Sequence, residues 1–141
     1  MGTLFKAKRA DGKGWQEGYV VKGFADSVLM CSEQISGEHT DRGQKVGFFN
    51  RVIPETVSQF TGKQIEGINL FKGDKIKSFH FRARQSNHFL EHVILWSDEY
   101  SCWMASSDGT TEIKNGNVFL YIFLKNAIEP KIIGNIHDDG K

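Results

Sequence analysis

The residues of this chain that could do chemistry are few and widely spaced. His88 and His92 are separated by three residues, a spacing that places two metal ligands on one face of a helix. The surrounding NHFLEHVILW is typical of a turn followed by a strand, where two such residues lie about 13 Å apart and cannot share one metal ion. No cysteine cluster or second histidine pair completes a site. We therefore expect no metal and no cofactor.

The acidic and thiol side chains do not form a recognisable catalytic set either. Paired-carboxylate catalysis requires two acidic groups that converge in one pocket, and the sequence indicates no such pair. The acidic residues near predicted turns are Glu55, Asp74, Asp98 and Glu99. Cys102 lies in an alternating strand and is typical of a core thiol. Phosphate-binding, dinucleotide-binding and nucleophile-elbow motifs are absent from the sequence. We expect no catalytic residues and a protein that is not an enzyme.

A basic strand is the first candidate for binding. It carries Lys75, Lys77, His80, Arg82 and Arg84. Single-stranded nucleic acid is bound by basic grooves in which exposed aromatic rings stack on the bases. Alternation places Phe79 and Phe81 on the face opposite His80, Arg82 and Arg84, which favours a core role for the two phenylalanines. Nucleic acid is therefore an alternative partner, and not the favoured one.

A second candidate surface is aromatic. The candidate interface residues are Trp15, Tyr19, Phe48 and Phe49. Phe48 and Phe49 are consecutive, so one of their rings must lie on each face of a strand. Trp96 and Trp103 flank a hairpin turn and could stack across it. We expect a homo-oligomer with an interface above about 1,000 Å², and a further phage or host protein as a partner.

Composition limits the class of protein. The chain has 141 residues, 11 phenylalanines and 3 tryptophans, which is enough apolar material for one folded unit. Its 18 basic and 17 acidic residues leave a net charge of +1, so no global charge attracts nucleic acid or anionic lipid. Two cysteines do not make a disulfide framework and indicate a cytoplasmic protein. No apolar run approaches about 20 residues, so we expect no membrane span.

Glycines recur between short apolar stretches, and this pattern predicts a chain of β-strands joined by tight turns. The expected strands are Leu4–Lys8, Gln16–Val21, Ser27–Cys31, Phe48–Ile53, Glu55–Phe60, Lys75–Ala83, His92–Trp96, Cys102–Ala105, Val118–Leu124 and Lys131–Asn135. Val118–Leu124 is apolar on both faces, and its periodicity does not distinguish a strand from a short buried helix.

The stretch from Val52 to Ile76 resembles the signature of the YopX family, small proteins encoded by phages and prophages. The matching residues are Thr56, Val57, Gln59, Phe60, Thr61, Gly62, Gly67, Gly73, Asp74 and Ile76. Further blocks, Lys6–Val21, His92–Ser106 and Lys131–Asp139, resemble other parts of the family pattern. Lys72 and Gln64 depart from it, because the family has acidic residues there. The resemblance implies an origin in a phage or prophage and a bacterial host, and it implies no activity.

These elements together predict a mainly β protein. We expect a small N-terminal β lobe, residues 1–62, packed on an SH3-like five-stranded barrel, residues 63–137, followed by a tail, residues 138–141. The expected buried residues of the barrel are Phe79, Phe81, Val93, Leu95, Phe119 and Ile133. Gly62, Gly73, Asp74 and Gly134 are the expected turn residues, with Asp74 accepting hydrogen bonds from turn N–H groups. We interpret the chain as a non-catalytic protein-interaction or assembly module.

Overall fold

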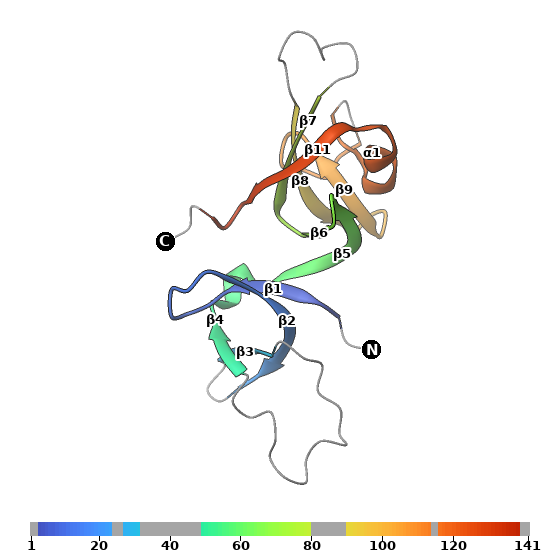
Figure 1. The fold of residues 1–141 in the computed structure, drawn as a ribbon. Helices are drawn as coiled ribbons and strands as arrows, with labels where there is room; N and C mark the ends of the chain where they lie inside the picture. The colour runs from blue at the N-terminus through green and yellow to red at the C-terminus, as the bar shows by residue number, and fades with distance from the viewer. Residues whose placement is uncertain (1–2, 24–26, 32–48, 80–89, 114–115, 139–141) are drawn as a thin grey trace. The chain divides into compact units, whose positions relative to one another are not determined.

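In a computed structural model, the chain forms two compact units, Met1–Phe60 and Thr61–Lys141. The structure describes residues 3–23, 27–31, 49–79, 90–113 and 116–138. The protein is mainly β, as predicted, with two antiparallel sheets and one short α-helix (Figure 1).

The first unit is built from short antiparallel strands. These are β1 (Phe5–Lys8), β2 (Trp15–Lys22), β3 (Val28–Cys31), β4 (Phe49–Val52) and the first part of β5 (Ser58–Ile65), with a 3-10 helix at Pro54–Thr56. With β6 (Ile68–Phe71), they make a six-stranded sheet in the order β4-β3-β2-β1-β5-β6. Ala7, Met30 and Val52 form the small buried core of this unit.

The second unit contains a five-stranded sheet with the order β10-β9-β8-β7-β11. Its strands are β7 (Asp74–Phe79), β8 (Leu90–Ser97), β9 (Cys102–Ser106), β10 (Val118–Phe119) and β11 (Ile128–Asn135). The apolar run Val118–Leu124, whose structure the sequence left open, divides into β10 and the helix α1 (Leu120–Asn126). Leu120 and Phe123 of α1 pack into the core with Ile76, Ile94 and Ala105.

The predicted five-stranded barrel is not closed in the part of the chain that the structure describes. β10 and β11 are the two edges of the sheet, and no pairing joins them. The helix α1 lies between them in sequence, so the chain leaves the edge strand β10, forms about two turns of helix, and returns as β11, which pairs with β7 at the other edge.

The buried face of β7 and β8 is the opposite of the one that the sequence suggested. Ile76 and Ile94 are fully buried, whereas the expected core residues Phe79, Val93 and Leu95 are only half-buried. Asp74, Ser78 and His92 are also buried, on the same face as the two isoleucines. Polar residues on the core face interrupt the apolar alternation, and this caused the wrong assignment.

The other expected core residues also differ. Phe119 is half-buried, Ile133 is exposed, and Phe81 lies outside the described residues. The cross-strand register explains Phe119, because it lies opposite Met104 rather than opposite Ala105 of the core face. Met104 and Leu95 are themselves opposite one another, so these three residues share the face of the sheet opposite to that of Ala105. Met104 is fully buried on this face, whereas Leu95 and Phe119 are half-buried.

A two-residue turn that the sequence analysis did not single out joins β5 and β6. Glu66 and Gly67 have φ angles of 54° and 79°, and two positive values in a two-residue loop define a type I′ hairpin. Gly62, expected in a turn, has a φ of 88° but lies within β5. Gly73 has a φ of 85°, as a turn residue before β7 requires, while Gly134 lies within β11 at 159°, close to extended backbone.

Asp74 at the start of β7 and Asn135 at the end of β11 are a directly opposed pair on neighbouring strands, and they form what we call the Asp74–Asn135 clasp. The Asp74 carboxylate accepts a hydrogen bond from the Phe71 N–H at 2.8 Å and one from the Asn135 side-chain amide at 2.9 Å. Asn135 Nδ2 also donates to the Lys72 carbonyl at 3.2 Å. The predicted acceptance of a turn N–H by Asp74 is confirmed. Both side chains are buried, so each depends on these partners.

Candidate binding surfaces

The aromatic residues predicted in the first unit are not strongly exposed. Trp15, Tyr19 and Phe49 are half-buried, and Phe48 lies outside the described residues. Tyr19 and Phe49 both lie opposite Cys31, so they flank this buried thiol on one face of the sheet. The Trp15 ring is covered by the ammonium groups of two lysines of β1, Lys6 at 4.8 Å and Lys8 at 5.8 Å from its centroid. This cation–π packing accounts for Trp15 within the chain.

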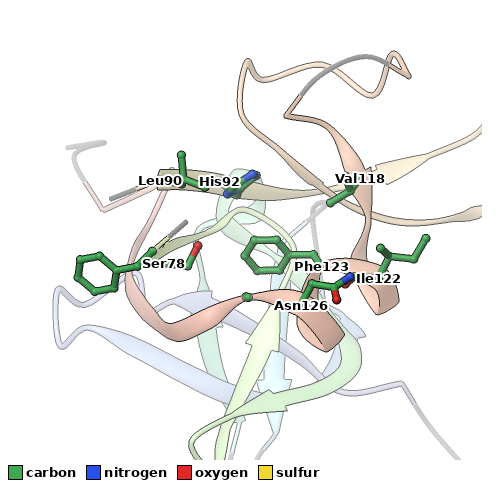
Figure 2. Close-up of a pocket in the computed structure, with 9 residues that line it drawn as sticks. Ser78, Leu90, His92, Val118, Ile122, Phe123 and Asn126 are labelled. Atoms are coloured by element: carbon green, nitrogen blue, oxygen red, sulfur yellow. The ribbon is translucent and has the colours of Figure 1, made fainter. Parts of the chain in front are cut away.

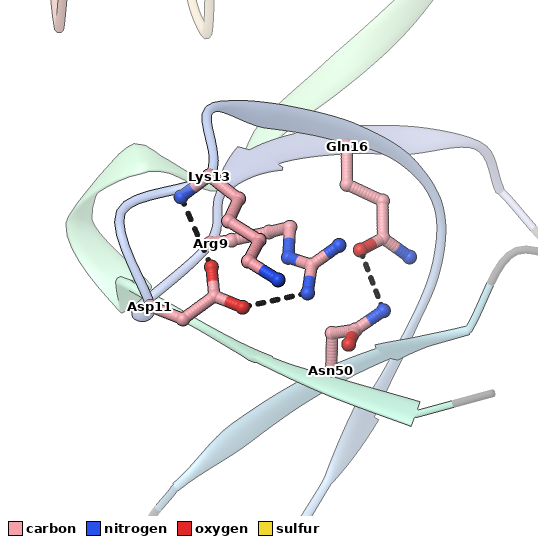
Figure 3. A network of polar contacts seen from close by, with 5 residues as sticks. All are labelled: Arg9, Asp11, Lys13, Gln16 and Asn50. Atoms are coloured by element: carbon pink, nitrogen blue, oxygen red, sulfur yellow. Dashed lines mark hydrogen bonds and ion pairs between the residues drawn. The ribbon is translucent and has the colours of Figure 1, made fainter. Parts of the chain in front are cut away.

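The turn between β1 and β2 is held by polar contacts (Figure 3). Arg9 Nη2 lies 2.6 Å from Asp11 Oδ2, and the Lys13 N–H donates to Asp11 Oδ1 at 3.0 Å. The hydrogen bond from Arg9 lowers the pKa of Asp11, an exposed residue. The Asn50 amide of β4 donates to Gln16 Oε1 of β2 at 2.9 Å. These contacts shape the turn, and exposed ion pairs of this kind add little stability.

Lys75 and Lys77, the described residues of the predicted basic strand, share a face with Phe79. These three residues alternate with the buried Asp74, Ile76 and Ser78 along β7. The other members of that set, His80, Arg82 and Arg84, lie outside the described residues. Lys77 also lies opposite Lys131 of β11 and Glu91 of β8, so the face carries both signs of charge. A hollow of about 400 Å³ here is lined by Lys77, Phe79, Glu129, Lys131 and Ile133.

The second unit carries an exposed aromatic row that the sequence analysis missed, formed by Tyr100, Phe119 and Tyr121. The ring centroids of Tyr100 and Phe119 are 5.7 Å apart in an edge-to-face arrangement. Phe119 and Tyr121 are nearly parallel, with centroids 6.4 Å apart. Tyr100 is 44% exposed and Tyr121 is 64% exposed. Tyr100 comes from the β8–β9 turn, whereas Phe119 and Tyr121 come from the consecutive elements β10 and α1, so no single linear pattern indicated the row.

Trp96 and Trp103 contact one another across the β8–β9 hairpin, as predicted. They are a directly opposed pair with centroids 5.1 Å apart in an edge-to-face arrangement. Trp103 packs against the core of the second unit, whereas Trp96 is 41% exposed at the end of its strand. Trp96 therefore adds a further exposed ring near the turn that holds Tyr100.

A pocket of about 320 Å³ lies between β7, β8 and α1 (Figure 2). Ser78 and Phe79 of β7, Leu90 and His92 of β8, and Val118 of β10 line one part of it. Ile122, Phe123, Asn126 and Ala127 line the other. Figure 2 shows His92 above Phe123, and their ring centroids are 4.7 Å apart with a tilt of 55°. The volume is within the range typical of small-ligand sites.

The imidazole of His92 has an unusual environment for a polar group. The residue is only 7% exposed, and burial lowers its pKa, opposed by a hydrogen bond to the Gly116 carbonyl. Its Nδ1 atom is buried and has no hydrogen-bond partner. The nitrogen that donates to Gly116 is therefore Nε2, and the neutral ring presents Nδ1 as an unused acceptor. A buried acceptor without a partner is uncommon and costs folding free energy.

The predicted acidic and thiol candidates are dispersed. Glu55, Asp98 and Glu99 are exposed, while Asp74 is held in the clasp. Cys31 is buried and Cys102 is half-buried, and both are free thiols. Among the described residues, no group of three or more His, Cys, Asp or Glu side chains could hold a metal ion. His88, the other histidine whose spacing from His92 was considered, lies outside the described residues.

Comparisons with known proteins found no matching family model, no matching curated protein and no matching solved structure. Among the described residues, no helix is long and apolar enough to cross a membrane.

Proposed function

We propose that this protein is a non-catalytic protein-interaction or assembly module that acts through the aromatic row of its second unit. The YopX-like sequence blocks support an origin in a phage or prophage and action in the cytoplasm of a bacterial host. The observation that carries the proposal is the exposure of Tyr100 and Tyr121 on either side of Phe119.

The physical argument rests on what these rings would gain by being covered. Tyrosine rings supply a large contact area at a low entropic cost, and they are enriched among residues that dominate binding energy. The row is already ordered by its own ring contacts, so little freedom remains to be lost on association. Ile122, 36% exposed on α1, extends the apolar surface beside Tyr121.

Self-association is the form of assembly that we propose, because a symmetric interface requires only one complementary patch. In sedimentation at micromolar concentration, the protein should be heavier than its 16.0 kDa monomer. Combined Tyr100→Ala and Tyr121→Ala changes should return it to the monomer. The matched control is Ile68→Ala, which removes an exposed side chain of β6 outside the row and should leave the mass unchanged. A monomeric unmodified protein would contradict self-association.

We also propose that the second unit is an open variant of an SH3-like fold. The strand order β11-β7-β8-β9-β10 supports this, because a four-stranded meander is followed by a short helix and a last strand that returns beside the first. This connection places the aromatic row at the junction of the β8–β9 turn and α1.

Nucleic-acid binding is the second candidate function, and one observation favours it. Phe79 shares the half-exposed face of β7 with Lys75 and Lys77, so an aromatic ring and basic groups lie together there. Glu91 and Glu129 on the neighbouring strands weaken the positive charge of this face. Salt-dependent retention on heparin that is lost after Lys75→Ala and Lys77→Ala changes would support this function. Retention that these changes leave intact would count against it.

A further inference from the structure

We propose that the first unit binds single-stranded DNA on the face of its sheet that lies opposite its core. Lys6, Lys8 and Arg51 contact the phosphates, and the rings of Tyr19 and Phe49 stack on bases. This inference concerns the first unit alone. It does not depend on the proposed function, which rests on the aromatic row of the second unit.

The strand register assigns the cations and the rings to one face. Directly opposed residues of antiparallel strands lie on the same face, and successive residues lie on opposite faces. Ala7, Met30 and Val52 define the core face. The residues that alternate with this core lie on the other face, which we call the outer face. They include Lys6, Lys8, Arg51, Trp15, Tyr19 and Phe49.

Backbone pairing at the end of β1 brings the cations of two strands together. Arg9 pairs with Val52, and backbone hydrogen bonds of 2.9 Å join β1 and β4 on both sides of this pair. Lys8 and Arg51 each precede a member of the pair, so they are diagonal neighbours on the outer face. Such neighbours lie about 7–8 Å apart.

The charge of this face favours a polyanion. Lys6 and Lys8 place their ammonium groups over the Trp15 ring, 4.8 Å and 5.8 Å from its centroid, so both charges are already ordered on the outer face. Arg51 is exposed. The strands β1–β4, which the structure describes in full, contain four basic residues and one acidic residue, Glu17. Phosphates along a nucleic-acid strand complement several ordered cations.

The two rings favour a single strand over a duplex. Tyr19 and Phe49 both lie opposite Cys31, on the two neighbours of β3, so their backbones are about 10 Å apart. Both side chains are half-buried and keep part of their surface open to solvent. Bases in a duplex are paired and follow one another at about 3.4 Å, so none is free to lie on a ring. Bases of a single strand are free to do so.

The side chains beside these rings favour DNA over RNA. Val21 and Leu29 are a directly opposed pair on the outer face, between Tyr19 and Arg51 in the register. A 2′-hydroxyl laid on these apolar side chains would lose its hydration without gaining a partner. The methyl group of thymine would instead bury apolar surface there.

The direct test is fluorescence anisotropy of a labelled thymidine oligonucleotide, about 12 nucleotides long, titrated with the full chain. Each neutralised phosphate of a single strand contributes about −0.7 to the slope of log affinity against log salt, so three cations predict a slope of about −2. Lys6→Ala combined with Lys8→Ala should weaken binding at low salt and bring the slope to about −0.7. Absence of binding at low salt, or an unchanged slope in this variant, would overturn the proposal.

Two charge variants elsewhere in the chain locate the binding. Lys22→Ala removes an exposed lysine that lies opposite Val28, at the far end of β2 and on the core-face register, and should leave the slope unchanged. Lys75→Ala combined with Lys77→Ala tests the face of β7 and should also leave it unchanged. A reduced slope in this last variant alone would assign the DNA to β7 and contradict the inference.

Variants of the outer face separate the rings from the charges. Tyr19→Leu should weaken binding about tenfold at every salt concentration with the slope retained, whereas Tyr19→Phe should bind like the unmodified chain. Glu17→Gln removes the carboxylate opposite Lys6 and should tighten binding, an effect that unfolding does not produce. Equal affinity of the two Tyr19 variants would overturn stacking on this ring. No gain in Glu17→Gln would overturn phosphate contact beside Lys6.

Two further oligonucleotides test the choice of ligand. A uridine oligonucleotide of the same length and the duplex of the thymidine strand with its adenosine complement should each bind more weakly than the thymidine strand alone. Equal or tighter binding of either one would overturn single-stranded DNA as the ligand of this face.

Discussion

At the scale of single residues, His92 is the side chain whose state depends most on its surroundings. It occupies a core position of β8, against Phe123 of α1, where an isoleucine or valine would be expected. Its neutral form is tolerated there because Nε2 has the Gly116 carbonyl as a partner. Its charged form would place a second N–H, at Nδ1, in a site that offers no acceptor.

This arrangement predicts a loss of stability in mild acid. The pKa of His92 in the folded chain is lowered from its ordinary value of 6.5, so the unfolded chain binds the proton more readily. The stabilisation that the neutral His92 contributes to the folded chain is therefore fully present above pH 6.5. It is lost as the pH falls through the lowered pKa of the folded state. Urea unfolding at a series of pH values from 7.5 to 5 measures how the free energy of unfolding depends on pH.

The control for this prediction is His92→Phe, which keeps a ring against Phe123 and removes the titration. The free energy of unfolding of this variant should depend less on pH than that of the unmodified chain over the same interval. Identical pH dependence in the two proteins would mean that other groups cause the acid sensitivity.

At the scale of elements, the positions of most strands could be predicted from the sequence. Which face of each strand is buried could not be predicted. Runs such as Val28–Cys31 and Leu90–Ser97 combine β-forming residues with flanking turn signals, which define strands locally. Which face is buried depends on what packs against it. In β7 and β8, the core face includes Ser78 and His92, whereas the half-exposed face includes Phe79 and Leu95. Residue type alone therefore indicated the wrong face.

Because the buried face of β7 is the one that carries Ile76, substitution of Ile76 should destabilise the fold more than substitution of Phe79. Ile76 is fully buried in the core of the second unit, so Ile76→Ala should cost about 2–5 kcal/mol of unfolding free energy. Phe79 is half-buried at the end of β7, so Phe79→Ala should cost less than Ile76→Ala despite removing more atoms. Denaturant titrations of both variants give the comparison. A larger loss for Phe79→Ala would restore the assignment made from the sequence.

The candidate sites were less predictable than the strands. The His92 pocket and the aromatic row each take residues from several elements that lie between Ser78 and Ala127 in sequence. The sequence analysis did single out His92, but because of its spacing from His88. It also singled out Phe79, but as an expected core residue. The position of α1 was the missing information, because an apolar run of seven residues fits a strand or a helix equally.

At the scale of the whole molecule, the chain has two cores of unequal size. Met30 belongs to the core of the first unit, and Ile94 to the core of the second. Met30→Ala should therefore cost about 2–5 kcal/mol and act mainly on the first unit. Hydrogen exchange should show loss of protection in β2 and β3, with protection in β8 and β9 retained.

The matched variant is Ile94→Ala, which should give the reverse pattern of exchange. Loss of protection throughout the chain in either variant would mean that the two units unfold as one cooperative structure. Such a result would contradict the separation of the cores.

The Asp74–Asn135 clasp has a consequence for how the protein is made. Its two side chains are 61 residues apart in sequence, and β11, which ends at Asn135, pairs with β7, the first strand of the same sheet. On a translating ribosome, β7, β8 and β9 emerge well before their last neighbour. Until β11 follows, the carboxylate of Asp74 lacks its amide partner, and β7 presents an unpaired edge. The second unit therefore completes its sheet late in synthesis. Nascent chains that stall before Asn135 keep the unpaired edge of β7 exposed, and we expect chaperones and proteases to bind these chains.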